Sequence, residues 1–227
     1  MWLPINRECI RIRRYLDQKV SWSRLDVLSA RADYARLPDV IIKYSQAKPI
    51  MVFCFTRKSC AEAAKLLAEW WRISTPRERY WPAPSDQIAV EDKGLQSMSS
   101  PVTYRNKVLI PTGMVAAGVA VHHAGLSQQD RTAVERAYLA GSLSVICCTS
   151  TLAVGVNLPC HMVIIKNTVG YEAGAIKEYS DLEIMQMIGR AGRPQFDTSA
   201  LAVIMTKMQQ VKHYEQLLSG QERLESW

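Results

Sequence analysis

Several features that mark other protein classes are absent from this sequence of 227 residues. No apolar run approaches the roughly 20 residues that a membrane-spanning helix needs, and no signal peptide opens the chain. The six cysteines include no C-x-x-C pair, which argues against a disulfide framework and against a zinc site. We therefore expect a soluble, intracellular protein with buried free thiols, no bound metal and no membrane contact.

Acidic residues are fewer than basic ones, 21 against 28, so the formal net charge is +7. A positive balance favours an anionic partner, although many basic proteins bind none. The apolar fraction of 48% permits a proper core, and the length permits one large or two small domains. Composition alone leaves the function open.

A complete phosphate loop is also absent. Gly113 and Gly118 have the G-x-x-x-x-G spacing of such a loop. A working loop continues with Lys and then Ser or Thr, but Val119 and Ala120 occupy those positions. No adjacent Asp-Glu pair is present to hold magnesium and activate water. These residues therefore do not make a complete nucleoside-triphosphate site by themselves.

Short apolar runs alternate with capped segments of helical periodicity after the first 35 residues. The runs predict strands at residues 50–55, 119–123, 143–148, 162–166 and 201–205. Three capping pairs indicate helix starts: Ser59 with Glu62, Ser127 with Asp130, and Ser180 with Glu183. A last amphipathic helix is predicted at residues 209–218. This order predicts an α/β domain over residues 36–220, with a mainly parallel sheet and helices on both faces.

Three stretches fall outside this pattern. Residues 1–35 are basic and alternate only at CIRIRRY, which fits either an edge strand or a loose arm. Residues 74–104 are rich in proline, serine and charge, which predicts a long surface insertion. Residues 221–227 resemble the start of a connection to a further domain.

The segment QMIGRAGRPQ places Arg190 and Arg193 three residues apart, each behind a glycine, Gly189 and Gly192. A guanidinium fork matches phosphate oxygens, and glycine lets the backbone come close. Without a phosphate loop of their own, such arginines fit one half of a two-part site, where they stabilise charge on a transferring phosphoryl group. The alternative is a glycine-rich turn with solvated arginines.

Polar residues also follow the predicted strand that ends at Cys148. Thr149, Ser150 and Thr151 lie where open α/β sheets usually bind ligands, and Gly155 and Asn157 follow them. Hydroxyls and free backbone geometry at this position indicate a ligand-binding edge.

Four segments, in this order, resemble the second RecA-like lobe of superfamily-two helicases: VFCFTRKSCAEAAKLL, VAVHHAGLSQQDR, CTSTLAVGVNLP and MQMIGRAGRPQFDTSALAVIM. The resemblance covers roughly residues 34–220. The sequences NLP, SDLEIMQ and QMIGRAGRPQFDTSA are similar to the motifs of one helicase branch, which includes the archaeal repair helicases and the spliceosomal unwinding ATPase. Within that branch the chain most resembles the meiosis-specific 3′–5′ DNA helicases. The fold that this implies is RecA-like, of the P-loop-NTPase type, but without its own phosphate loop.

The resemblance also implies roles for single residues. Arg190, Arg193 and Gln186 would be catalytic, facing ATP and Mg²⁺ that a missing first lobe holds. Gly155, Asn157, Gly189 and Gly192 would line the nucleotide. The nucleic-acid strand would be held, without sequence readout, by Thr56, Arg57, His123, Gly125, Thr149, Ser150 and Thr151. A metal role for His123 is disfavoured because its neighbour His122 points to the opposite face of the strand.

A hairpin is predicted between the last two motifs, where Gly170, Tyr171 and Gly174 punctuate two short strand-like pieces. In the helicases that the chain resembles, a hairpin at this place parts the duplex. Tyr171 would then stack on the last base pair. An ordinary solvent-exposed hairpin is the alternative.

The resemblance implies one motor lobe of an ATP-dependent 3′–5′ DNA helicase that acts in meiotic recombination, in the nucleus. Its partners would be single-stranded and duplex DNA, together with three kinds of domain that are missing from this sequence: the first RecA-like lobe, a winged-helix domain and a ratchet domain. Alone, the chain is expected to lack ATPase activity. Two alternatives are a lobe of a related RNA-unwinding ATPase and a non-catalytic docking module.

Overall fold

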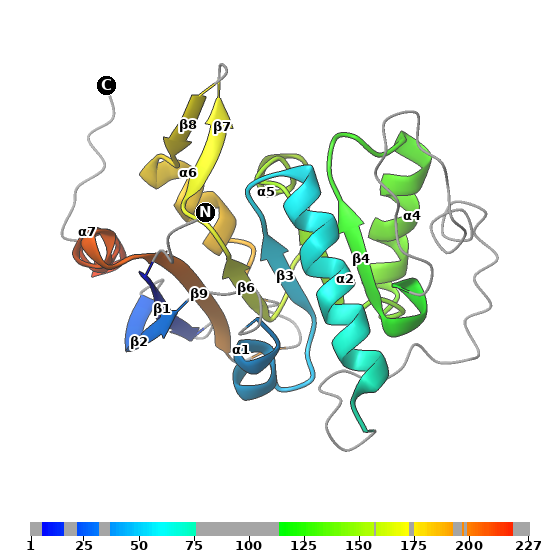
Figure 1. Cartoon of the computed structure of the whole chain (residues 1–227), viewed down its shortest axis with the longest axis horizontal. Helices are drawn as coiled ribbons and strands as arrows, with labels where there is room; N and C mark the ends of the chain where they lie inside the picture. Colours follow the sequence, from blue (N-terminus) through cyan, green and yellow to red (C-terminus); the bar gives the residue numbers. More distant parts are fainter. Residues whose placement is uncertain are drawn as a thin grey trace.

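A computed structural model describes residues 6–15, 22–31, 37–75, 114–156, 158–172, 175–192, 197 and 199–219. Five of the described strands are mutually parallel: β3 (Ile50–Phe53), β4 (Val119–His122), β5 (Val145–Cys148), β6 (Met162–Ile165) and β9 (Ser199–Lys207). They lie side by side in the order β9-β6-β3-β5-β4 (Figure 1). Each predicted strand is therefore confirmed, with ends that differ by two residues at most.

The helices cover both faces of this sheet, as expected. The chain moves through α2 (Arg57–Ile73) from β3 outward to β4. It returns in the opposite direction through α4 (Gln128–Leu139), α5 (Leu152–Gly155) and α6 (Asp181–Ile188). Because parallel crossovers are right-handed, opposite directions place the helices on opposite faces. In Figure 1, α2 lies in front of the sheet and α6 behind it.

The core lies between these layers. Every residue of β3, β4, β5 and β6 is buried, which explains why these strands are continuous apolar runs and do not alternate. Small side chains such as Ala63 and Ala64 let α2 approach the sheet closely, and Leu67 fills the space beyond them. Trp71 is buried, whereas Trp70, which the periodicity places on the apolar face, is only partly buried. The RecA-like α/β fold is confirmed.

Two long strands extend the sheet on the β9 side. β1 (Asn6–Tyr15) pairs antiparallel with β9, and β2 (Trp22–Arg31) pairs antiparallel with β1 at the edge. Helix α7 (Met208–Ser219) packs against β1, β2 and β9. Of the two alternatives for the first 35 residues, the structure has strands wherever this stretch is described.

Local capping decides where the helices begin. Ser127 and Ser180 cap α4 and α6 as predicted, the latter in a box with Glu183. The prediction for α2 is wrong by three residues, because Thr56 and Ser59 bond each other's backbone amides and form the box. Ser59 is thus the third residue of the helix and not its cap. The predicted insertion at 74–104 lies outside the described residues except for its first two.

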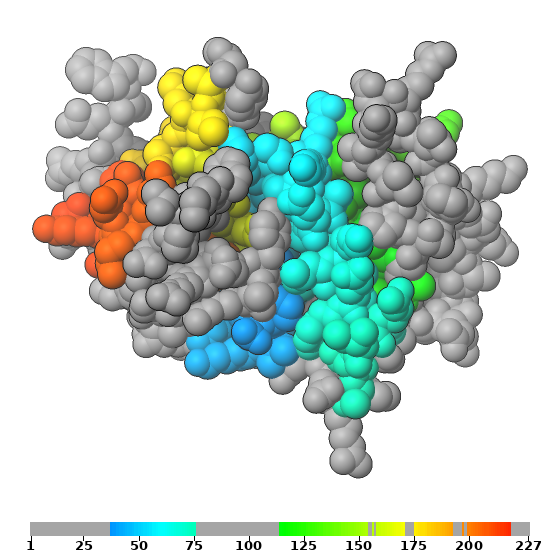
Figure 2. All heavy atoms as spheres, in the orientation of Figure 1, coloured from blue at the N-terminus to red at the C-terminus, as the bar shows by residue number. Residues whose placement is uncertain are grey.

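Figure 2 shows how this arrangement reaches the surface: side chains of α2 occupy the centre of the visible face, and the β7–β8 hairpin projects above it, in yellow. The hairpin is formed by β7 (Val169–Glu172) and β8 (Ala175–Glu178), which pair antiparallel, as predicted.

None of the helices described is long and apolar enough to cross a membrane. A short helix, α1 (Leu37–Tyr44), packs against α2.

Candidate functional site

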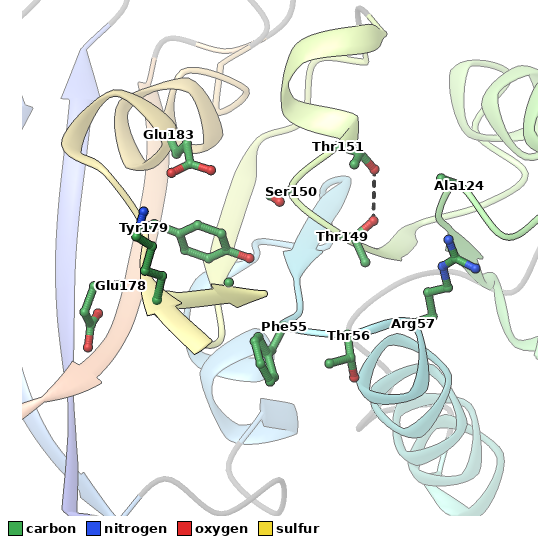
Figure 3. Close-up of a pocket in the computed structure, with 12 residues that line it drawn as sticks. Phe55, Thr56, Arg57, Ala124, Thr149, Ser150, Thr151, Glu178, Tyr179 and Glu183 are labelled. Atoms are coloured by element: carbon green, nitrogen blue, oxygen red, sulfur yellow. Dashed lines mark hydrogen bonds between the residues drawn. The ribbon is translucent and has the colours of Figure 1, made fainter. Parts of the chain in front are cut away.

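The loops that follow β3, β4 and β5 meet at the carboxyl edge of the sheet. They border a cavity of about 450 Å³, together with residues of the hairpin base and the first turn of α6 (Figure 3). Thr56 and the Thr149–Thr151 loop are among the residues that line it. This is the edge at which open α/β sheets bind ligands, and it is where the sequence places the strand-holding residues.

Arg57, His123 and Gly125 are brought together at this edge although they follow different strands. A Cβ added to Gly125 would lie 2.9 Å from Nη1 of Arg57 and 3.2 Å from Nδ1 of His123. A larger residue here would displace the end of the Arg57 side chain, which lies across the glycine. The backbone amide of Gly125 donates to Nδ1 of His123 over 3.2 Å, which fixes the imidazole ring.

Burial and, to a smaller extent, the nearby positive charge of Arg57 lower the pKa of His123 to about 4. The imidazole is therefore neutral at pH 7. His122 points the other way, and its Nε2 lies 2.7 Å from a carboxylate oxygen of Glu135 in α4. The two histidines thus serve opposite faces of β4, and only His123 belongs to the carboxyl-edge group. Burial also lowers the pKa of His122, although its contact with Glu135 opposes that shift.

The hydroxyl-rich loop after β5 is ordered by its own hydrogen bonds. The Oγ1 atoms of Thr149 and Thr151 lie 3.0 Å apart, and the amide of Ala153 donates to the carbonyl of Ser150 over 2.9 Å. The hydroxyl of Thr56 is used differently, because it accepts the amide of Ser59 and caps α2. Thr56 therefore offers its cap geometry, and not a free hydroxyl, to a ligand.

Arg190 lies at a second place, next to the amino end of β6. It follows the end of α6, and its carbonyl accepts the amide of Cys160, just before that strand. Its guanidinium reaches toward α5, where Nε donates to the carbonyl of Ala153 over 2.9 Å and Nη2 donates to the same oxygen. Arg190 is half-buried and held by its own domain.

The other residues of that motif are placed unevenly. Gln186 lies half-buried on α6, and Gly189 ends that helix. Gly192 has a φ of 124°, which favours glycine, and its amide donates to the carbonyl of Cys160 over 2.6 Å. Gly155 is the last residue of α5. Arg193 and Asn157 lie outside the described residues, as does the side chain of Tyr171, whose backbone belongs to β7.

The predicted site residues therefore form two groups joined by one loop. The residues that are predicted to hold the nucleic-acid strand lie at the carboxyl edge, near the cavity. Arg190 lies beyond them. The loop from Thr149 through α5 belongs to both, because its start borders the cavity and Ala153 binds Arg190. The sequence did not indicate this link, since a backbone carbonyl carries no residue-specific signal.

Gly113 lies outside the described residues, and the described part of the segment with phosphate-loop spacing, residues 114–118, is a turn at the amino end of the sheet. Residues Val115–Ala117 form a short 3₁₀ helix, and Gly118 follows with a φ of 73°. The carbonyl of Gly118 accepts the amides of Ser144 and Val145, so this turn anchors the amino end of β5. A phosphate loop instead follows the carboxyl end of a strand, which agrees with its exclusion from the sequence.

Comparison with known proteins identifies the family to which this domain is similar. A family model described as the helicase conserved C-terminal domain matches residues 102–195. The chain carries a helicase conserved C-terminal domain. It is 43% identical to the ATP-dependent DNA helicase MER3 of Saccharomyces cerevisiae, over 85% of the chain and 14% of that relative. It is 41% identical to the probable ATP-dependent DNA helicase HFM1 of Homo sapiens, over 84% of the chain and 12% of that relative.

The chain is also similar to a protein that is named as an RNA helicase. The Arabidopsis thaliana DExH-box ATP-dependent RNA helicase DExH14 is 36% identical over 82% of the chain and 8% of its own length. The chain thus spans 14% or less of the length of each of these relatives. The predicted resemblance to the C-terminal domain of DNA helicases is confirmed.

The helicase domain also has residues at the site that the motifs did not indicate. Tyr179, Lys177 and Glu183 border the cavity from the hairpin and α6. Their only signal in the sequence is their position beside the Ser180 capping box. In the described part of the chain, no three His, Cys, Asp or Glu side chains gather closely enough to hold a metal ion. Five of the six cysteines are buried free thiols, as expected: Cys54, Cys60, Cys147, Cys148 and Cys160.

Proposed function

We propose that this helicase domain is the second motor lobe of an ATP-dependent DNA helicase. It would act on ATP bound by a first RecA-like lobe that lies outside these residues. The supporting observation is the shared loop, which begins at the strand-holding cavity and ends at the carbonyl that Arg190 binds. A lobe that converts phosphate chemistry into movement along a strand needs such a physical connection between its two sites.

On the nucleotide side, Arg190 and Arg193 would donate to phosphate oxygens, and Gln186 would link them to the first lobe. Gly155, Asn157, Gly189 and Gly192 would let the backbone approach the nucleotide. ATP with Mg²⁺ would supply the phosphoanhydride whose cleavage drives the cycle. The metal would be held by the first lobe.

The residues fit that role in one testable respect. Arg190 donates to an uncharged carbonyl oxygen, which is a weaker partner than a phosphate. Its guanidinium can therefore exchange Ala153 for a phosphate oxygen when the two lobes close. A side chain already held by a carboxylate would have to break an ion pair first.

On the strand side, the Thr149–Thr151 hydroxyls and the group formed by Arg57, His123 and Gly125 would hold successive phosphates. Arg57 would supply the positive charge, since burial keeps His123 neutral. Backbone and hydroxyl contacts of this type position a strand without reading its bases. The hairpin would part the duplex, with Tyr171 at the last base pair, and the strand would be followed in the 3′–5′ direction.

The resemblance to meiosis-specific helicases extends the proposal to the cell. The helicase would act in meiotic recombination in the nucleus, on single-stranded and duplex DNA. Winged-helix and ratchet domains would complete the grip on the strand.

Arg190→Ala and Arg193→Ala test the nucleotide half in a protein that contains both lobes. We expect ATP binding to be retained and hydrolysis to fall by about 10³–10⁵, because each arginine stabilises transferring charge. Arg136→Ala, on the exposed side of α4, is the matched control and should leave hydrolysis unchanged. Wild-type hydrolysis in both arginine variants, or ATP turnover by the 227-residue chain alone, would refute the assignment.

An RNA substrate is the second candidate, and the similarity to DExH14 favours it. Competition between single-stranded DNA and RNA of the same sequence for the two-lobed protein distinguishes the two. Stronger competition by RNA would move the proposal to an RNA-unwinding ATPase. Binding of neither strand would favour a non-catalytic docking module.

A further inference from the structure

We infer that Tyr179 is a positioning residue that holds the Thr149–Thr151 loop against the base of the β7–β8 hairpin. This inference rests on the proposed function, because it links the strand-holding loop to the element that would part the duplex. Tyr179 lies in the two-residue connection between β8 and α6, at one wall of the cavity. No motif that identified the domain assigns it a role.

The first contact joins Tyr179 to the hairpin. Its backbone amide donates to the carbonyl of Thr168, the residue before β7, over 2.8 Å. Its ring lies against Gly170, where an added Cβ would lie 2.6 Å from Cε1 of the tyrosine. Gly170 is therefore a seat for the aromatic ring, and a larger residue there would displace it.

The second contact joins Tyr179 to the strand-holding loop. The phenol points from the hairpin base toward Ser150 across the cavity wall (Figure 3), so that the two side chains lie within reach of a hydrogen bond. Burial raises the pKa of Tyr179, so the hydroxyl keeps its proton at neutral pH and can take part in that bond. The ring is partly buried against the core.

The third connection runs through α6. Ser180, the next residue, caps this helix with Glu183, and Arg190 follows its far end. The loop is thus held at Ser150 from the start of α6 and at Ala153 from its end. Any displacement of α6 reaches the loop at both points and reaches the hairpin through Tyr179. Arg190 alone would move only the Ala153 end.

The test uses the 227-residue chain, with hydrogen exchange of single amides and binding of a fluorescein-labelled oligo-dT strand. The informative amides are those of Leu152 and Ala153, which donate to Thr149 and Ser150 within the loop, and that of Tyr179. Tyr179→Phe keeps the ring on Gly170 and removes the hydroxyl. Tyr179→Ala removes both. Tyr138→Phe, a buried tyrosine of α4 outside the cavity, is the control.

In Tyr179→Phe we expect faster exchange at Leu152 and Ala153, unchanged exchange in the hairpin, and oligo-dT affinity reduced about three- to tenfold, the loss of one hydrogen bond. In Tyr179→Ala exchange should rise in loop and hairpin together. A purely structural tyrosine would instead lower the melting temperature of Tyr179→Phe without a local change in the loop. Loop exchange equal to the control in Tyr179→Phe would overturn the inference, whether or not Tyr179→Ala folds.

The two readouts separate this inference from the proposed function. If the wild-type chain fails to bind oligo-dT, the strand-holding role loses its support, while loop exchange still decides whether Tyr179 positions the loop. If the wild type binds and Tyr179→Phe changes neither exchange nor affinity, the proposed function survives and the positioning role does not.

Discussion

The two edges of the parallel sheet use polar residues in opposite ways. At the amino edge, Lys48, His161 and Asp197 precede three neighbouring strands and lie together: Nζ of Lys48 lies 2.9 Å from one oxygen of Asp197, and Nδ1 of His161 lies 3.6 Å from the other. The side chain of Asp197 is fully buried. At the carboxyl edge, by contrast, the Thr149–Thr151 loop and Arg57 are partly or fully exposed beside a cavity.

The difference separates residues that serve the fold from residues that are available to a ligand. A buried carboxylate needs its partners, because an unpaired charge in the core costs several kcal/mol. Half-exposed hydroxyls need no such compensation and can exchange water for phosphate oxygens. Substitutions at the amino edge should therefore change stability, and substitutions at the carboxyl edge should change binding more than stability.

Removal of the amino-edge carboxylate should have the largest effect on stability. Asp197→Ala removes the buried carboxylate and its charged contact with Lys48, so we expect a loss of about 1.5–3 kcal/mol in the free energy of unfolding. Because Lys48 remains 34% exposed, the lower end of that range is favoured. Urea unfolding of the chain measures it.

The exposed pair Lys65–Glu69 on α2 supplies the matched control for that measurement. Its charges lie 3.9 Å apart and both side chains are 56% exposed. Lys65→Ala should therefore change stability by less than about 0.5 kcal/mol. An equal effect at both pairs would remove the distinction between the two edges.

Thr56 sharpens the comparison because it caps a helix at the carboxyl edge. Thr56→Ala should lower the free energy of unfolding by about 0.5–2 kcal/mol, since the amide of Ser59 loses its acceptor. Thr56→Ser keeps that acceptor and should retain both stability and oligo-dT binding. Thermal unfolding and fluorescence anisotropy measure the two effects. If Thr56→Ser loses affinity at full stability, the methyl group contacts the strand directly and the cap is not the whole role.

His123 should have the smallest effect near neutral pH, and this effect grows as the pH falls. Its pKa is about 4 in the folded chain and 6.5 in the ordinary case, so the unfolded chain takes up a proton first. Stability is therefore lost as the pH falls from about 6.5 toward 4. At pH 6 the free energy of unfolding has fallen by less than about 1 kcal/mol through this effect. His122 contributes in the same direction, because its pKa is also lowered.

His123→Asn removes this titration and keeps an acceptor for the amide of Gly125. The melting temperature of this variant, measured between pH 7 and pH 5, should fall less steeply than that of the wild type. Parallel curves for the two proteins would show that His123 is protonated without cost, and that the carboxyl edge is more open to water than its burial indicates.

Much of the fold follows from patterns within short segments. Continuous apolar runs predict the buried strands, and Ser127 and Ser180 start their helices where the capping pattern places them. The start of α2 was misplaced because the sequence offers two overlapping boxes, and only Thr56 has the extended backbone that a cap requires. The β1–β2 addition was left undecided, since pairing with β9 joins residues nearly 200 positions apart.

The candidate site divides in the same way. Its chemistry could be predicted, because hydroxyls after β5 and arginines behind glycines are visible in the residue order. The contact of Arg57 with Gly125 could not, and neither could the seat of Tyr179 on Gly170. These depend on close approach between side chains and glycines of separate strands, which periodicity does not encode.

By itself, the sequence determined the order of strands and helices, the caps of two of them, and the residue types at the carboxyl edge, because each depends on neighbours within a few positions. Only the tertiary structure decided that Arg190 rests on Ala153, that Tyr179 bridges hairpin and loop, and that Asp197 is buried with its partners. These contacts form only after the parallel strands are assembled, since assembly brings distant segments within hydrogen-bonding reach.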